Sequence, residues 1–244
     1  MLRARPLFQQ VLVSGGTSGI GGAIARAFAA AGHQVIATGV SQAEVEAAGQ
    51  ESAGEYLRYE VLDVRSAEQI ARIIASFSRI DVLVNCAGII RRGGAEHDPV
   101  AFAEVLDVNL TGTMRLCTAA RPLLKESKGC VLNTASMLSF FGSGIAPAYS
   151  ASKGGVAQLT KSLAIAWAAD GIRVNAIAPG WIETPLTEPL TSDPARRQNI
   201  VDRTPLARWG QPDDVVGAAL FLSSPAAAFI TGVILPVDGG YSIV

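Results

Sequence analysis

The chain has 244 residues, of which 49% are hydrophobic and 17% are charged, and its formal net charge is −1. This composition is too apolar for a disordered chain, and it lacks the excess of basic residues that suits nucleic-acid binding. The three cysteines, Cys86, Cys117 and Cys130, have no zinc-ligand spacing, which indicates a reducing compartment and argues against both disulfides and a metal site.

The N-terminal segment shows no targeting signal. Arg3 and Arg5 precede an apolar stretch, 11–13, that is far too short for the apolar region of a signal peptide or for a membrane span. No other apolar run reaches the needed length without Gly, Pro or a charge. We therefore expect a cytoplasmic protein whose partners include neither a membrane nor a nucleic acid.

A glycine-rich turn follows the first predicted strand, 10–14. It runs Gly15-Gly16-Thr17-Ser18-Gly19-Ile20-Gly21 and leads into an alanine-rich helix, 23–31, and a second strand, 34–38. Glycines at such a turn let the backbone approach a diphosphate, whose charge is stabilised by the N–H groups at the helix N-terminus. The turn is also compatible with a mere tight connection, but the strand before it and the helix after it favour a nucleotide site.

Short apolar strands and helices continue to alternate along the rest of the chain. The next predicted elements are a strand at 56–62 ending at Asp63, a helix at 67–77, a strand at 80–84 running into the turn 85–88, and a long helix at 99–124 interrupted at Asn109 and Gly112. After these come a strand at 129–134 that delivers Ser136, a helix at 149–169, a strand at 173–178 before Pro179-Gly180, a polar, Pro-rich segment at 181–209 without a clear strand, a helix at 215–222 and a strand at 233–237.

This alternation predicts an α/β fold with a seven-stranded parallel sheet covered by helices on both faces. No linker, repeat or shift in composition divides the chain, so we expect a single dinucleotide-binding catalytic domain over residues 1–244. In such sheets ligands bind beyond the carboxyl ends of the strands. Those ends carry Gly15, Asp63, Asn85, Ser136 and Pro179.

Tyr149 and Lys153 form a candidate acid/base pair. Residues four apart lie on one face of a helix, about one turn from each other. The pKa of free tyrosine, near ~10, is too high for a general base at neutral pH, and an ammonium held close by favours the phenolate. The same spacing also arises by chance, so the pair gains weight only from the motifs around it.

Taken together, the motifs resemble those of the short-chain dehydrogenase/reductase family over essentially the whole chain, and the resemblance implies a doubly wound Rossmann fold. The matching residues are Ser14-Gly15, Gly19-Ile20-Gly21, Asp63-Val64, Asn85-Cys86-Ala87-Gly88, Asn109, Ser136, Tyr149 with Lys153, and Pro179-Gly180 with Thr184. Two residues depart from the pattern. Ser14 stands where threonine is usual, and Cys86 replaces a common second asparagine.

The resemblance implies a catalytic role for four residues. Tyr149 would exchange a proton with the carbonyl or alcohol oxygen as hydride moves to or from the nicotinamide, and Ser136 would hydrogen-bond the same oxygen. Lys153 would depress the tyrosine pKa and bind the nicotinamide ribose. Asn109 would anchor a water that links Lys153 to solvent. A catalytically silent nucleotide-binding protein on the same fold is the non-enzymatic alternative.

The resemblance further implies an NAD(P)(H) cofactor. The residues it assigns to cofactor binding are Ser14, Gly15, Thr17, Ser18, Gly19, Ile20, Gly21, Gly39, Asp63, Val64, Asn85, Ala87, Gly88, Tyr149, Lys153, Pro179, Gly180, Ile182 and Thr184. An acid at the end of the second strand would bind the ribose 2′-hydroxyl and repel a 2′-phosphate. Segment 37–41 offers neither an acid nor an arginine, which slightly favours NADP(H), with the Thr38 or Ser41 hydroxyl available to the phosphate.

The substrate is left between two classes. Arg91 and Arg92 after the 85–88 turn, with Met137 and Leu138 after Ser136, resemble the subgroup that acts on deoxy sugar acids, and an arginine fork suits a carboxylate. A solvated surface pair is the alternative for the arginines. An apolar rim favours acyl, steroid-like or aromatic ketones, and it consists of Met137, Leu138, Phe140, Phe141, Trp181 and Ile182.

Two further expectations concern the lid and the assembly. Segment 181–209 resembles the variable substrate lid of the family. The long helices at 99–124 and 149–169 are apolar over more than one face, whereas a sheet covers only one face of each. The remaining apolar surface and the family resemblance predict a homotetramer.

Overall fold

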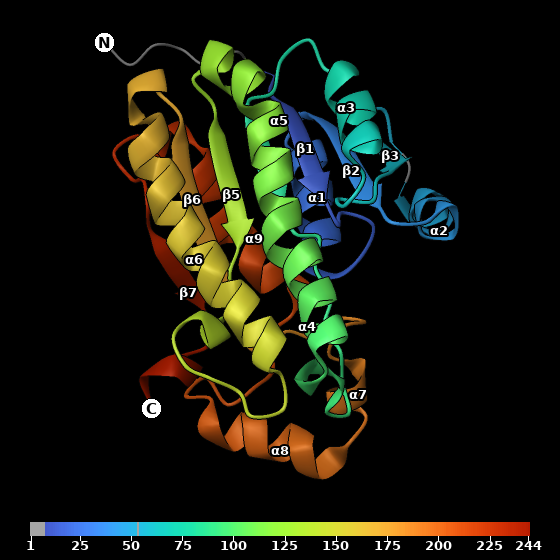
Figure 1. Ribbon diagram of the computed structural model, residues 1–244, viewed down its shortest axis with the longest axis vertical. Helices are drawn as coiled ribbons and strands as arrows, with labels where there is room; N and C mark the ends of the chain where they lie inside the picture. The colour runs from blue at the N-terminus through green and yellow to red at the C-terminus, as the bar shows by residue number, and fades with distance from the viewer. Residues whose placement is uncertain (1–7, 53) are drawn as a thin grey trace.

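A computed structural model describes residues 8–52 and 54–244 of the protein. Residues 1–7, with Arg3 and Arg5, and residue 53 lie outside the described part. The described chain forms a seven-stranded parallel sheet in the order β3-β2-β1-β4-β5-β6-β7, with helices on both faces (Figure 1). The strands are β1 Gln10–Ser14, β2 Gln34–Gly39, β3 Leu57–Val61, β4 Val82–Asn85, β5 Cys130–Thr134, β6 Arg173–Pro179 and β7 Ile234–Val237.

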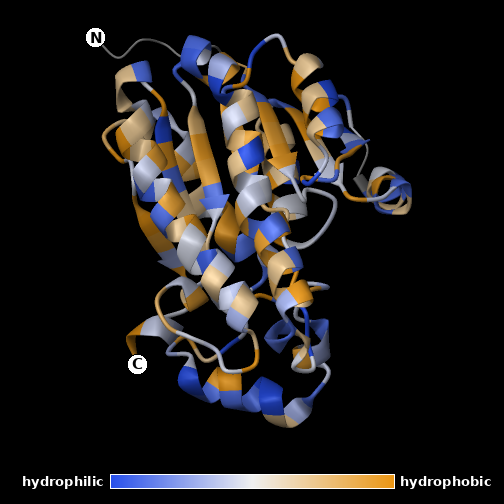
Figure 2. Ribbon diagram, in the orientation of Figure 1, coloured by the Kyte–Doolittle hydropathy of each residue, from blue (hydrophilic) through white to orange (hydrophobic). Residues whose placement is uncertain are grey.

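The helices form two layers that bury opposite faces of the sheet. Along β1, Leu12 packs against the layer of α3, α5 and α6, whereas Val11 and Val13 pack against α1 and α9, as the two-residue period of a strand requires. The α-helices are α1 Gly19–Ala30, α2 Gln42–Ser52, α3 Ala67–Ala75, α4 Pro99–Leu106, α5 Gly112–Ser127, α6 Pro147–Trp167, α7 Glu188–Thr191, α8 Pro194–Arg203 and α9 Pro212–Ser223. The strands are mostly hydrophobic, whereas α8 is mostly hydrophilic (Figure 2).

The predicted order of strands and helices is confirmed, and the predicted interruption of the long helix is real. Between α4 and α5, residues Asp107–Thr111 form a π-helical turn that contains Asn109. Single π turns inside α-helices often mark functional sites. This turn lets Asn109 point to the end of β4 while the helix continues past it.

The sequence prediction missed three helices. Helix α2 has few apolar residues and so gives a weak helical period, although Ser41 caps it by accepting the Glu44 N–H at 3.3 Å. Helices α7 and α8 lie in segment 181–209, whose prolines in the first turns of these helices indicated irregular structure. Pro194 stands at the first position of α8, where a missing N–H has no cost, and Asp193 caps this helix through the Ala195 N–H. In the described part of the chain no helix is both long and apolar enough to cross a membrane.

Candidate active site

A cleft of about 640 Å³ opens at the carboxyl ends of the strands, within the range of small-molecule sites. It is lined by the glycine turn after β1, the ends of β2 to β6 and the start of segment 181–209. The lining includes most residues predicted for cofactor and catalysis, namely Gly15, Thr17, Ser18, Gly19, Ile20, Gly21, Gly39, Asp63, Val64, Ala87, Gly88, Ser136, Tyr149, Lys153, Pro179, Gly180, Ile182 and Thr184. Residues separated by up to 169 positions thus meet in one cleft.

Ser136 and Tyr149 face each other across the cleft. Ser136 follows β5, and its hydroxyl accepts the Leu138 N–H at 3.1 Å and is hydrogen-bonded to the Tyr149 phenol. Ser139 accepts the Ser136 N–H at 3.2 Å and donates to the Lys153 carbonyl at 2.7 Å. Ser139 therefore ties the end of β5 to the helix that carries Tyr149, which brings the hydroxyls of Ser136 and Tyr149 together in the cleft.

Lys153 is a buried cation, and its ammonium donates to the Thr134 carbonyl at 2.7 Å. Its Nζ lies 5.6 Å from the centroid of the Tyr149 ring. Desolvation lowers the pKa of Lys153 to about 8. Gly88 lies beside this ammonium: a Cβ on Gly88 would lie 3.7 Å from Nζ and 3.3 Å from the Asn109 Oδ1.

The predicted lowering of the Tyr149 pKa by Lys153 stays a prediction. Burial raises the pKa of Tyr149 to about 12, and the groups that oppose this rise are Ser136, through its hydrogen bond, and Arg92, through its charge. The ammonium of Lys153 is directed to the Thr134 carbonyl. Tyr149 is consequently a neutral phenol at pH 7, ready to donate a proton.

Asn109 organises the loop after β4 from the π-helical turn. Its side chain accepts the Ile89 N–H at 2.8 Å and donates to the Ile89 carbonyl at 2.9 Å and to the Ser152 hydroxyl at 3.0 Å. The Asn109 carbonyl accepts the Thr113 hydroxyl at 2.7 Å. Asn109 thus joins the loop to the helix of Tyr149 and Lys153, and its predicted water-anchoring role stays a prediction.

The glycine turn brings three backbone segments close together. Gly15 has φ +64°, and a Cβ on it would lie 2.7 Å from the Ala87 Cα. A Cβ on Gly21 would overlap the Gly15 carbonyl oxygen. The backbones of the two turns and of helix α1 therefore meet without side chains between them, which leaves the N-terminal N–H groups of α1 facing the cleft.

Ser14 and Asn85, also predicted for the cofactor, do not line the cleft. Ser14 accepts the Ala87 N–H at 3.5 Å, and Asn85 donates to Asn133 at 2.9 Å and to the Cys117 sulfur at 3.3 Å. They hold the turn and the strand ends from inside the sheet. Cys86, in place of the common asparagine, contacts the Thr134 hydroxyl through its sulfur at 3.1 Å.

Glu44 of α2 lies in the cleft beside Gly39, where the sequence analysis found no acid. Its Oε2 accepts the Val40 N–H at 3.1 Å and the Thr17 hydroxyl at 3.5 Å. A helix at 42–52 was not expected, so the carboxylate it carries back to the end of β2 was missed. The S-x-x-E spacing of Ser41 and Glu44 was the available signal.

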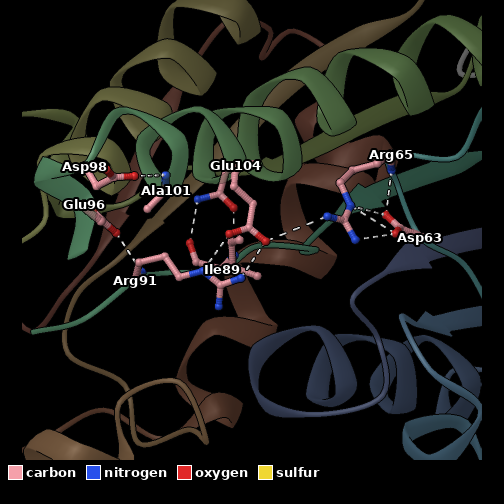
Figure 3. A network of polar contacts seen from close by, with 9 residues as sticks. Asp63, Arg65, Ile89, Arg91, Glu96, Asp98, Ala101 and Glu104 are labelled. Carbon is pink, nitrogen blue, oxygen red and sulfur yellow. Dashed lines mark hydrogen bonds and ion pairs between the residues drawn. The ribbon is translucent and has the colours of Figure 1, made fainter.

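The structure separates the two predicted arginines. Arg91 forms an ion pair with Glu104 at 2.6 Å, and Glu104 in turn lies 3.9 Å from Arg65, which is paired with Asp63 (Figure 3). Arg92 is half-buried and donates to the Leu186 carbonyl of the lid segment. The two arginines therefore do not form one fork. Of the two, Arg91 has an ion pair and Arg92 has none with a described residue.

Four of the six predicted rim residues are used for internal packing, whereas Phe140 is 52% exposed and the buried Ile182 lines the cleft. Met137 is buried with Leu190, Ile200, Trp209 and Tyr241, and the side chains of Leu138, Phe141 and Trp181 pack against this cluster. The Trp181 ring lies 5.7 Å from that of Trp209 and 6.1 Å from that of Tyr241. Met137, Leu138 and Trp181 thus hold the lid segment to the body and do not line the described cleft.

Comparison with known proteins decides the family. The family model described as Enoyl-(Acyl carrier protein) reductase matches residues 15–242. The 2-dehydro-3-deoxy-D-gluconate 5-dehydrogenase of Bacillus subtilis (strain 168) is 45% identical over 236 residues, which cover 94% of this chain and 93% of the relative. The chain belongs to the short-chain dehydrogenase/reductase family.

Other relatives of this short-chain dehydrogenase agree. Galactitol 2-dehydrogenase (L-tagatose-forming) of Cereibacter sphaeroides is 39% identical, with 95% of this chain and 94% of the relative covered. A solved structure provisionally described as a 2-deoxy-D-gluconate 3-dehydrogenase from Agrobacterium tumefaciens, with bound NADP, is 42% identical, with a TM-score of 0.86 and 97% of each chain covered. The protein is therefore an NAD(P)-dependent oxidoreductase acting on CH–OH groups, which confirms the predicted enzyme class.

Proposed function

We propose that this short-chain dehydrogenase interconverts a secondary alcohol and a ketone on a deoxy sugar acid related to 2-dehydro-3-deoxygluconate. The observation that carries the proposal is Arg92, a half-buried cation without an ion pair among the described residues. It lies close enough to Tyr149 to lower the pKa of the phenol. A carboxylate on the substrate is the natural counter-ion for such a group.

The chemistry follows from the chain's own residues. The chemistry that NAD(P) would supply when bound is hydride transfer to or from the substrate carbon. Tyr149, protonated because its pKa is about 12, donates its phenolic proton to the carbonyl oxygen, while the Ser136 hydroxyl hydrogen-bonds the same oxygen. In the reverse direction the Tyr149 oxygen takes the alcohol proton, and Lys153 one turn away stabilises the phenolate.

The cofactor would be held by the residues that line the cleft on the side of β1 to β4. The glycine turn and the N-terminus of α1 would receive the diphosphate, Asp63 and Val64 the adenine end, and Gly88 with Lys153 the nicotinamide ribose. We further propose that segment 181–209 is the substrate lid, and that the protein acts in the cytoplasm. The Arg92 contact with the Leu186 carbonyl supports a lid that rests on the substrate-binding loop.

Packing of the apolar side chains supports a sugar acid over an apolar ketone. Met137 is 3% exposed and the Leu138 and Trp181 side chains pack against its cluster, so this surface is used inside the protein. The 3-oxoacyl substrates named for a similar acyl-carrier-protein reductase of Thermotoga maritima would need an apolar channel for the acyl chain. The cleft instead carries Arg91 and Glu104 at its rim.

A kinetic screen tests the proposal. The protein is assayed with NADH and NADPH against 2-dehydro-3-deoxy sugar acids, a 3-oxoacyl thioester and neutral cyclic ketones. We expect turnover of the acids. Arg92→Ala should raise KM for the acid about 10- to 100-fold, the value of a lost charge-assisted hydrogen bond, and change KM for a neutral ketone little.

Arg91→Ala is the matched control for Arg92→Ala. The Arg91 charge is already compensated by Glu104, so its loss should affect acid and neutral substrates to a similar, smaller extent. Inert acids together with active neutral ketones or thioesters would contradict the sugar-acid proposal and leave the enzyme class intact.

A further inference from the structure

Glu96 is a buried carboxylate in the loop between β4 and α4. Only 1% of the residue is exposed, and it lies in the short 3₁₀ turn Ala95–His97. Burying a carboxylate is costly unless hydrogen bonds compensate for the lost water. Two backbone groups do so here: Oε1 accepts the Arg91 N–H at 2.9 Å and Oε2 accepts the Tyr149 N–H at 2.9 Å.

The contact with Tyr149 supplies a missing cap. The first N–H groups of a helix have no partner within it, and Ala146, at the N-cap position of α6, makes no side-chain capping bond. Pro147, the first residue of α6, has no N–H. Glu96 satisfies the Tyr149 N–H from 53 residues away, and the positive end of the helix dipole favours its charge.

Glu96 also binds the backbone of Arg91, the residue before Arg92 in the loop after β4. Figure 3 shows Glu96 reaching the Arg91 backbone while the Arg91 side chain turns to Glu104. The same carboxylate therefore holds the backbones of Tyr149 and of the residue before Arg92. Its two oxygens fix the distance between the acid/base and the cation that faces it.

We infer that Glu96 is a positioning residue for the reaction, which clamps Tyr149 of α6 to the Arg91–Arg92 loop so that the phenol and its neighbouring cation meet the same substrate. Glu96 does not touch the reacting atoms. The inference rests on the proton chemistry of Tyr149 within the proposed function. It does not depend on which carbonyl compound is bound, so any substrate found in the screen can test it.

The charge of Glu96 also affects the pKa of Tyr149. The groups that face the Tyr149 phenol are Ser136 from the end of β5, Arg92 and Glu96 from the loop after β4, and Lys153 from α6. The negative charge of Glu96 raises the pKa of Tyr149, and that of Arg92 lowers it. Removal of the Glu96 charge should therefore move the tyrosine-dependent limb of the pH–rate profile to lower pH.

The test compares Glu96→Gln and Glu96→Asp with the wild-type protein. Glu96→Gln keeps the size but accepts only one of the two N–H groups, and we expect kcat to fall about 10- to 100-fold, as for a catalytic group displaced by about 1 Å. The alkaline limb should move to lower pH. Glu96→Asp keeps the charge but is one methylene short, so kcat should fall while the limb stays near its wild-type position. Cofactor Kd, measured by quenching of tryptophan fluorescence, should stay within about twofold in both variants.

Asp98→Ala is the control from the same loop. Asp98 caps α4 by accepting the Val100 N–H at 2.9 Å and the Ala101 N–H at 3.2 Å (the latter drawn in Figure 3), so its carboxylate serves α4 and not the start of α6. Its loss should lower the melting temperature, as the loss of a cap worth about 1 kcal/mol does, without shifting the pH profile. A Glu96→Gln enzyme with wild-type kcat and pH profile would overturn the inference, as would losses that only match those of Asp98→Ala. If Glu96→Gln does not fold, a wild-type kcat for Glu96→Asp has the same force.

Discussion

Burial changes the proton affinities of Tyr149 and Lys153 in opposite directions. Desolvation penalises the charged form of each group, so it raises the pKa of the phenol to about 12 and lowers that of the ammonium to about 8. At pH 7 the phenol is neutral and the lysine still charged. These protonation states fit the proposed role of Tyr149 as proton donor and of Lys153 as the cation that stabilises the remaining phenolate.

Replacing Tyr149 by phenylalanine removes the proton donor and little else. The Tyr149→Phe variant should lose at least about 10²-fold in kcat, the usual contribution of a positioned acid or base. Cofactor Kd, measured by fluorescence titration, should remain close to that of the wild-type protein. A variant with near-normal turnover would show that another group donates the proton.

Lys153 links catalysis to stability. Its pKa is lower in the folded chain than the ordinary value of 10.5, so the folded state binds fewer protons between pH 8 and 10.5. Below pH 8 the buried charge lowers the free energy of unfolding by its full cost. As the pH rises from 8 to 10.5 this cost disappears, so the free energy of unfolding increases.

A Lys153→Met variant should reveal this cost. Between pH 8 and 10.5 the wild-type protein should gain up to roughly 3 kcal/mol in unfolding free energy relative to the variant. Urea unfolding at pH 7 and pH 10 measures the difference, and the variant should be inactive at both. A constant difference across this range would contradict the lowered pKa.

The turn between β1 and α1 brings the backbones of β1, α1 and the turn after β4 into close contact. Helix α1 begins against the Gly15 carbonyl, and the Gly15 backbone in turn touches the Ala87 backbone after β4. Strand ends and helix start are thus in direct backbone contact, which leaves the helix N-terminus uncovered toward the cleft. Glycine is required at these points by space as well as by the positive φ of Gly15.

Neighbouring glycines of α1 offer a matched pair of substitutions. Gly21→Ala would drive a methyl group into the Gly15 carbonyl. A Cβ on Gly22 would be tight only against the flexible end of Arg26, at 3.2 Å, and would make ordinary contacts of 3.5 Å with the Gly16 and Thr17 backbone. We expect Gly21→Ala to weaken cofactor binding at least tenfold and lower the melting temperature. Gly22→Ala should bind normally and gain up to about 1 kcal/mol from helix propensity. Calorimetric titration and thermal melts distinguish the two, and equal behaviour would contradict the close approach.

At the scale of the whole molecule, apolar side chains remain exposed on the long helices. Ile165 of α6 is 79% exposed and Val100 of α4 is 78% exposed, and the two helices lie side by side (Figure 1). Phe229 near the C-terminal strand is also fully exposed. A homotetramer of this 25.3 kDa chain would cover such surface through symmetric contacts, and it stays a prediction.

Light scattering at micromolar concentration tests the assembly. We expect a mass about four times that of the chain. Ile165→Glu should reduce it if the α6 face is part of the interface, and Lys161→Glu, also on α6, controls for the added negative charge. A monomer in the wild-type protein would refute the prediction.

The sequence by itself determined the strands, most helices and the candidate acid/base pair, because those signals are local. Alternating apolar runs, the glycine turn and the four-residue spacing of Tyr149 and Lys153 each lie within one element or one turn. Even the interruption of the long helix at Asn109 was visible, since a polar residue stands inside an apolar pattern.

Tertiary structure decided which of these residues act together. Arg91 and Arg92 are adjacent in sequence, yet one pairs with Glu104 and the other reaches Leu186, 94 residues away. Glu44 reaches the end of β2 only because an unpredicted helix turns it back, and Glu96 caps Tyr149 across 53 residues. Such partners depend on how separate elements pack, and hydrogen bonds of this range leave no periodic signal in the sequence.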